Sequence, residues 1–151
     1  YGLIMLQKKD FAAAKENADL AFQYSLQNKS EYAKAINYIR LIEYYLQTDD
    51  VKNAYNMYHK SKKLCEKNNF YYWLNLLKIR KAKIQLIDRD ISFRRIIREL
   101  QEILNYVQSY QLFLLEIEIY EILTQVYGKL KIANMAKLYF ERYKNKVMQA
   151  V

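Results

Sequence analysis

One short pattern recurs along the chain at a nearly constant spacing, and it limits the possible fold more than any other feature. An apolar helical stretch ends in a short polar turn and a second apolar stretch follows, as in residues 41–58. The residue pairs that open the second stretch are Asp10-Phe11, Asp50-Val51, Asp90-Ile91 and Ile132-Ala133, so the separations are 40, 40 and 42 residues. A period of this length predicts stacked helix pairs, an architecture that presents a surface to a partner.

The composition favours an all-α fold. The 151 residues include 2 Gly and 0 Pro, whereas the tight turns of all-β proteins and phosphate-binding loops rely on glycine. A content of 52% hydrophobic and 27% charged residues is typical of a soluble domain with a real core. We therefore expect one helical domain over residues 1–151.

The start of the chain predicts that it is a piece of a longer protein. Residues 1–7 are apolar and precede the turn at Asp10, so we expect them to be the last turns of a helix whose beginning is absent. No run of about 18 apolar residues occurs, and the first residues lack the features of a signal peptide. With a single cysteine, these features favour a cytoplasmic protein without a membrane span.

Apolar residues at spacings of three and four predict the individual helices. Ser30 and the aspartates at the turns are suitable N-caps, because their side-chain oxygens can accept from first-turn amides. We expect Gly128 to end its helix in the left-handed conformation common at helix C-termini. The predicted helices are 11–28, 31–47, 51–67, 70–87, 91–107, 112–127 and 132–148.

The paired helices share a residue pattern that resembles the tetratricopeptide repeat (TPR). Its best copy has Tyr120, Leu123, Thr124 and Tyr127 on the first helix and Ala136, Phe140 and Tyr143 on the second; another has Tyr38, Leu41, Ile42 and Tyr45, then Asp50, Ala54 and Tyr58. The resemblance covers nearly the whole chain, as copies 1–28, 30–68, 70–108 and 111–148. It implies a right-handed superhelix of antiparallel helix pairs, a TPR-like α-solenoid of about seven helices plus an N-terminal helix stub.

The third copy departs from that pattern. Lys78 and Gln85 stand in place of aromatic residues, and Arg94 and Arg98 replace the small and aromatic residues of the second helix. The spacing of about 40 residues also exceeds the 34 of the usual repeat. Such long repeats are similar to those of bacterial signalling and regulatory proteins, which implies an interaction or sensory segment of a larger signalling or transcription-regulatory protein.

The resemblance also implies a partner site. The first helix of each TPR pair lines the concave face, where a peptide or protein partner binds. The corresponding positions here are Ile39, Glu43, Gln47, Leu76, Ile79, Lys83, Glu118, Glu121 and Gln125. Ile39 and Glu43 occupy two places where chaperone-binding TPRs have Lys and Asn, so we expect no clamp for a terminal carboxylate there and a groove of mixed polarity instead.

The positive charge supplies an alternative function. The net charge is +9, and its excess lies in the middle of the chain at Lys60, Lys63, Lys67, Lys78, Arg80, Lys81, Arg94, Arg95 and Arg98. We favour a solvated face whose Lys and Arg stems cover apolar surface. The alternative is nucleic-acid or other polyanion binding.

No motif in the sequence indicates catalysis, so we expect a non-enzymatic protein without a cofactor or metal. His59 and Cys65 are too few ligands for a structural zinc site, and we expect Cys65 to be a small packed residue. We interpret Glu116, Glu118 and Glu121 as a solvated charged face rather than an acid and base pair. A third hypothesis is a homodimer formed through the terminal repeats, where apolar faces lack neighbours.

Overall fold

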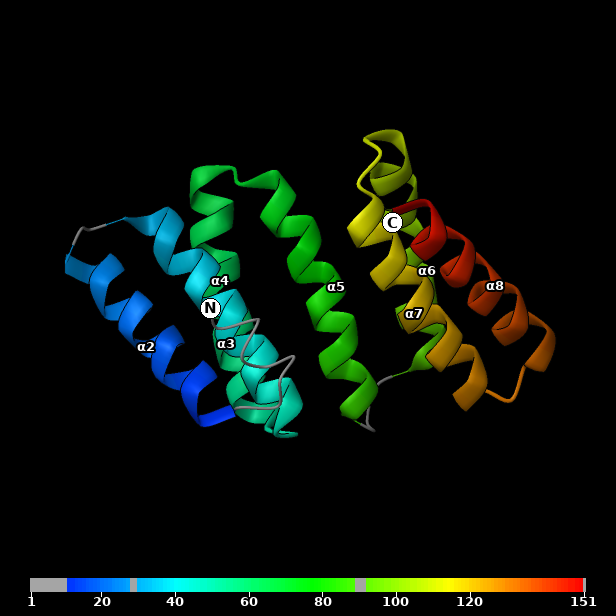
Figure 1. Ribbon diagram of the computed structural model, residues 1–151, viewed down its shortest axis with the longest axis horizontal. Helices are drawn as coiled ribbons and strands as arrows, with labels where there is room; N and C mark the ends of the chain where they lie inside the picture. The colour runs from blue at the N-terminus through cyan, green and yellow to red at the C-terminus, as the bar shows by residue number, and fades with distance from the viewer. Residues whose placement is uncertain (1–10, 28–29, 89–91, 151) are drawn as a thin grey trace. The chain divides into compact units, whose positions relative to one another are not determined.

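The computed structural model describes residues 11–27, 30–88 and 92–150. Within these ranges the chain forms seven α-helices and no strand (Figure 1), which confirms the all-α prediction. Within α2 to α5 and within α6 to α8, consecutive helices pack on one another as in a helical repeat, while the superhelix stays a prediction. The helices are α2 (Phe11–Gln27), α3 (Glu31–Gln47), α4 (Val51–Asn68), α5 (Tyr71–Ile87), α6 (Phe93–Ser109), α7 (Phe113–Lys129) and α8 (Ala133–Ala150).

The chain packs as two compact units that divide between Ile87 and Asp88. The first unit contains α2 to α5, and the second contains α6 to α8. The closest helix pairs are α3 with α4 and α7 with α8, which correspond to the predicted copies 30–68 and 111–148. The division falls inside the predicted copy 70–108, the copy with the least regular sequence, so its two helices belong to different units. The single domain over residues 1–151 stays a prediction.

Four helix ends share one turn geometry. Asp49, Asn69, Gln111 and Lys131 have φ values of 55°, 57°, 54° and 59°. In each turn the next residue donates its backbone N–H to a carbonyl five positions earlier, as in Asp50 to Tyr45 at 2.9 Å. This bond together with the left-handed residue is the Schellman arrangement, which satisfies carbonyls at a helix end. The turn positions lie 20 residues apart within each unit, at 49 and 69 and at 111 and 131.

The predicted role of Gly128 is wrong. Gly128 lies within α7, and Lys131 takes the left-handed conformation instead. Helical hydrogen bonding continues past the glycine, because the N–H of Leu130 donates to the carbonyl of Val126 at 3.0 Å. The turn therefore falls where α7 must reverse to pack on α8, and not at the residue with the greatest intrinsic freedom.

Two of the predicted N-caps are confirmed. Ser30 Oγ accepts from the N–H of Ala33 at 3.2 Å, and Asp50 Oδ1 accepts from the N–H of Asn53 at 3.2 Å. The predicted caps Asp10 and Asp90 lie outside the described residues.

Each unit has its own apolar core. In the first, Ile42, Ala54, Cys65, Ile79 and Ile84 have no exposed surface. The second core is formed by residues of α6 and α7, with a stacked pair from α7 and α8, Tyr127 and Tyr139, whose ring centroids lie 5.6 Å apart. Its fully buried members are Ile96, Leu100, Val107, Ile119, Ile122, Leu123 and Val126. Burial of each large apolar side chain stabilises the fold by about 1.5–3 kcal/mol. A single hairpin cannot bury its apolar face alone, so it depends on the neighbouring helices for this stabilisation.

Two polar contacts across helices fix the packing of the first unit. Ser61 on α4 is fully buried, and its Oγ donates to the carbonyl of Ala35 on α3 at 2.9 Å. Trp73 on α5 donates its indole N–H to the hydroxyl of Tyr32 on α3 at 3.2 Å. Because an unpaired buried donor is costly, the Ser61 contact specifies which faces of α3 and α4 meet.

Candidate functional site

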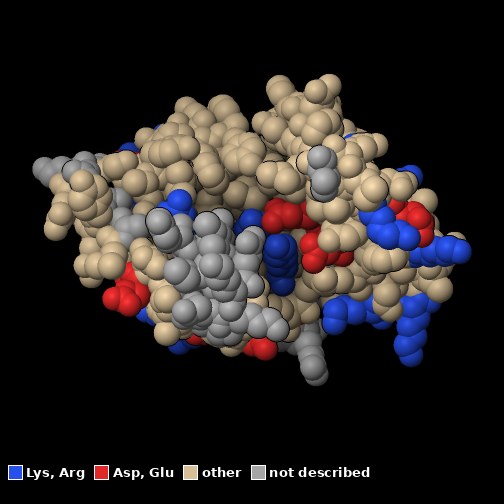
Figure 2. Space-filling model, viewed as in Figure 1, with Lys and Arg blue, Asp and Glu red and all other residues tan. Residues whose placement is uncertain are grey.

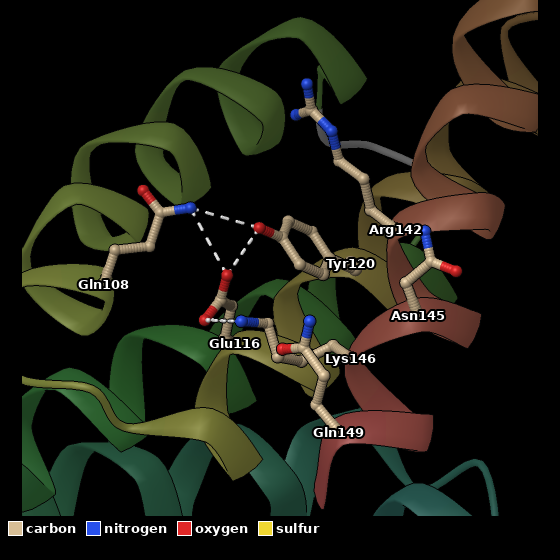
Figure 3. A pocket seen from close by; sticks show the side chains of 7 residues that line it. All are labelled: Gln108, Glu116, Tyr120, Arg142, Asn145, Lys146 and Gln149. Atoms are coloured by element: carbon tan, nitrogen blue, oxygen red, sulfur yellow. Dashed lines mark hydrogen bonds and ion pairs between the residues drawn. The ribbon is translucent and has the colours of Figure 1, made fainter.

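A pocket of about 310 Å³ lies in the second unit, between the end of α6, the first turns of α7 and the last turns of α8. Figure 3 shows its seven lining side chains, all of them polar or charged. They are Gln108 from α6, Glu116 and Tyr120 from α7, and Arg142, Asn145, Lys146 and Gln149 from α8. We call this site the Glu116 pocket.

Glu116 forms the wall of the pocket and is the most heavily bonded of these groups. Its Oε2 accepts from Tyr120 Oη at 2.6 Å and from Gln108 Nε2 at 3.3 Å. Its Oε1 pairs with Lys146 Nζ at 3.3 Å, although only 5% of its side chain is exposed. The position in the first turn of α7 adds the favourable field of a helix N-terminus. The carboxylate is thus held by three donors from three helices.

Tyr120 completes this hydrogen-bonded network. Its hydroxyl donates to Glu116 and accepts from Gln108 Nε2 at 3.1 Å. Burial raises the pKa of Tyr120 to about 12, and the hydrogen bond and charge of Glu116 act in the same direction. The phenol therefore stays protonated at neutral pH and acts as a fixed donor.

The α8 side of the pocket is a single helical stripe. Arg142, Asn145, Lys146 and Gln149 are spaced by three, one and three residues, which places them on one face of the helix. The guanidinium of Arg142 lies over the ring of Tyr139 at 5.2 Å, and the ammonium of Lys146 lies over Phe113 at 4.8 Å. Figure 2 shows Lys and Arg side chains gathered on the part of the visible face that lies over α8. This stripe supplies N–H donors to the pocket.

The three predicted partner-binding residues of α7 do not contribute to this pocket. With 3.6 residues per turn, Glu118, Glu121 and Gln125 lie about 140° to 180° around the helix from Glu116. Glu121 and Gln125 are exposed and Glu118 is partly exposed. These three residues lie on a different face of α7 from the pocket. The predicted solvated location is wrong for Glu116, because a lysine, a tyrosine and a glutamine enclose it.

In the first unit, the structure brings together some of the predicted partner-binding residues. Glu43 on α3 pairs with Arg80 Nε and, at 3.9 Å, with Lys83 Nζ, both on α5. Gln47 is exposed at the end of α3. The apolar members Ile39, Leu76 and Ile79 are no more than 7% exposed and form part of the core. The accessible members of this set are Gln47 and, in part, Glu43 and Lys83.

The predicted basic residues divide between the units. Lys60, Lys63 and Lys67 are exposed on α4, and Lys78 is exposed on α5, with Lys81 partly buried. Arg94, Arg95 and Arg98 are exposed on α6 in the second unit. Arg80 is 9% exposed and pairs with Glu43. Its assignment to a surface patch is therefore wrong, because its charge is used inside the first unit.

The remaining candidate ligands do not form a site. Cys65 is fully buried beside Ser61 Oγ at 3.9 Å, as predicted for a packed residue, and burial raises the pKa of its thiol. His59 stacks on Tyr55. Across residues 11–27, 30–88 and 92–150, no three His, Cys, Asp or Glu side chains are grouped to hold a metal ion. None of the helices in these ranges is long and apolar enough to span a membrane.

No protein-family model, curated protein or solved structure matched this chain. The TPR resemblance is therefore an expectation from the residue pattern alone. What the structure contributes is the geometry of the Glu116 pocket and of the Glu43 ion pairs.

The sequence contains two weak signals of the Glu116 pocket. Glu116 and Tyr120 are four residues apart, so a helix brings them to one face. The polar stripe from Arg142 to Gln149 has helical spacing. Neither signal reveals that this face of α7 lies next to the polar stripe of α8, because that contact depends on how the two helices pack.

Proposed function

We propose that this chain is a helical-repeat interaction module that binds a segment of a protein partner. The observation that supports it is the Glu116 pocket, whose volume of about 310 Å³ is in the range of sites that take a small group. Its polar lining suits the side chain or terminus of a peptide. The long repeats favour a larger signalling or transcription-regulatory protein as the parent of this module.

The chemistry of the pocket favours binding over catalysis. A general base must lie within hydrogen-bond reach of the proton that it abstracts. The side chain of Glu116 is only 5% exposed, and its oxygens already face Tyr120, Gln108 and Lys146. The buried side chains of Glu116 and Tyr120 thus hold the wall of the pocket in place. The exposed side chains of α8 are the ones that a segment of the partner would contact.

A photo-crosslinking experiment tests the proposal. A photoreactive phenylalanine analogue replaces Asn145 in the pocket, and in the control it replaces Asn105, an exposed residue of α6 that does not line the pocket. We expect a protein to be captured from the source cells through position 145 and not through position 105. The captured protein, once purified, should bind the unmodified chain and bind the Arg142→Gln variant about tenfold more weakly. Equal capture at both positions would contradict the proposal.

A second candidate function is polyanion binding by the first unit. Residues 1–87 contain fifteen Lys and Arg against eight Asp and Glu, a charge of +7, whereas residues 88–151 have ten against eight, a charge of +2. The exposed residues Lys60, Lys63 and Lys67 lie on α4 at helical spacing. Such a face suits the phosphates of a nucleic acid.

Gel retardation of a labelled duplex distinguishes this candidate. We expect retardation that weakens steeply with salt, and its loss when Lys60, Lys63 and Lys67 are all changed to Gln. The matched control changes Arg94, Arg95 and Arg98 to Gln, which removes the same charge from the second unit. Absence of retardation at low salt in the unmodified chain would exclude this function.

A further inference from the structure

We propose that the Glu116 pocket selects a carboxylate group of its peptide partner, with Arg142 as the residue that binds it. The inference rests on the proposed function, because it names the chemical group that the pocket recognises. It follows from three properties of the pocket: its charge, the bonding state of Glu116, and the donors on α8.

The charge of the pocket is not balanced by its own residues. Glu116 carries one negative charge, and Arg142 and Lys146 carry one positive charge each, which gives the lining a net charge of +1. Lys146 pairs with Glu116. Arg142 has no acidic partner among the residues that the structure describes. The pocket therefore favours an anion as its occupant.

Glu116 also shapes the choice between anions. It is buried and anionic, so it repels any further negative charge that comes close. A carboxylate brings one charge, which matches the net charge of the lining. A phosphate monoester brings about 1.5 to 2 negative charges and would leave an excess of negative charge beside the buried Glu116. This difference favours a carboxylate over a phosphate.

The donors on α8 have a suitable arrangement for a carboxylate. The ring of Tyr139 lies under the guanidinium of Arg142 at 5.2 Å, and stacking of this kind covers one face and leaves the N–H edges for bonding. A carboxylate accepts two parallel N–H bonds from such an edge. The amides of Asn145 and Gln149 lie one and two turns further along the same stripe. Their side chains can form hydrogen bonds with the peptide backbone of the partner next to the bound carboxylate.

The test is a titration of the isotope-labelled full chain with small probes, followed by nuclear magnetic resonance. Acetyl-glycylglycine presents a C-terminal carboxylate, and the α-amide of N-acetylglutamate presents a side-chain carboxylate. Their uncharged controls are acetyl-glycylglycine amide and N-acetylglutamine amide, and the α-amide of N-acetylphosphoserine is the phosphate arm. The side-chain amide signals of Asn145 and Gln149 report binding at the pocket.

We expect at least one carboxylate probe to shift these signals and to bind about tenfold more tightly than its amide. The Arg142→Gln variant should lose the preference, and Arg142→Lys should restore part of it. The control Arg98→Gln removes an equal charge from an exposed residue of α6 outside the pocket and should keep it. Circular dichroism verifies that each variant is folded.

Three results would overturn the inference: equal binding of carboxylates and amides, tighter binding of the phosphate probe, or carboxylate probes that leave Asn145 and Gln149 unshifted. The proposed function fails separately. If position 145 captures a protein but carboxylates have no advantage, the interaction module stands and the selectivity is wrong. If carboxylates bind but position 145 captures no protein, the pocket is specific for small acids and the proposed function is wrong.

Discussion

The two units of the molecule each enclose a glutamate between helices but balance its charge differently. In the first unit Glu43 faces two cations, Arg80 and Lys83, across the packed faces of α3 and α5. In the second unit Glu116 faces one cation, one phenol and one amide at the wall of a pocket. The first arrangement uses its charges to join two helices. In the second arrangement, Glu116 is bound partly by the neutral donors Tyr120 and Gln108. The cation Arg142 is therefore not needed to balance Glu116, and we propose that it binds an external group.

The largest expected effect breaks the first arrangement. Glu43→Gln removes the charge that faces Arg80 and Lys83, two groups whose side chains are 10% and 26% exposed. Removing one member of a buried ion pair is strongly destabilising, and we expect a loss of about 3 kcal/mol in the free energy of unfolding. Urea denaturation followed by circular dichroism measures it. A loss below about 1 kcal/mol would indicate that water reaches the pair.

The equivalent change in the second unit should cost less. Glu116→Gln keeps an oxygen for the bonds from Tyr120 and Gln108 but removes the partner of Lys146. Lys146 is 19% exposed beside the pocket and can turn toward water. We expect a loss of about 1.5 kcal/mol by the same urea assay. Equal losses of unfolding free energy for Glu116→Gln and Glu43→Gln would contradict the distinction between the enclosed Glu43 ion pairs and Glu116 at the pocket wall.

The pH dependence of the second unit sharpens the comparison. The pKa of Tyr120 is raised to about 12 in the folded chain, while an unfolded tyrosine titrates near pH 10. The stabilisation is therefore complete below pH 10 and is lost as the pH rises toward 12. We expect Tyr120→Phe to reduce the fall in unfolding free energy over this range, relative to the unmodified chain. Tyr72→Phe, at a 40% exposed tyrosine of the first unit, is the control and should leave the pH profile unchanged.

The smallest expected effect compares one turn from each unit. Lys131 has a φ of 59°, which is strained for a long side chain, while Asn69 has a φ of 57°, which asparagine tolerates. Lys131→Gly should raise the free energy of unfolding by about 0.5–1 kcal/mol, and Asn69→Gly should raise it less. Thermal unfolding of the two variants measures the difference. Equal gains would mean that asparagine has no advantage at this turn.

The fold could be predicted where it depends on local order along the chain. The spacing of apolar residues is enough to place the helices to within a few residues, and Ser30 and Asp50 are recognisable as caps because they bond to their own helix. Gly128 misleads because packing on α8, and not intrinsic freedom, sets the end of α7.

The candidate site could be predicted much less well, because it depends on residues far apart in the sequence. Glu43 and Arg80 are charged residues that look solvated on their own helices, and their burial follows only from the meeting of α3 and α5. The same holds for Glu116 and Lys146. Periodicity shows which residues share a face, but it carries no information about which faces meet.

Trp73 gives the two units different optical properties. It is the only tryptophan of the chain, and it donates to Tyr32 within the first unit. The second unit contains tyrosines but no tryptophan. Indole emission therefore originates in the first unit alone, while circular dichroism sums over the helices of both. A change of emission without a change of helicity would locate an event at α3 and α5 without any label.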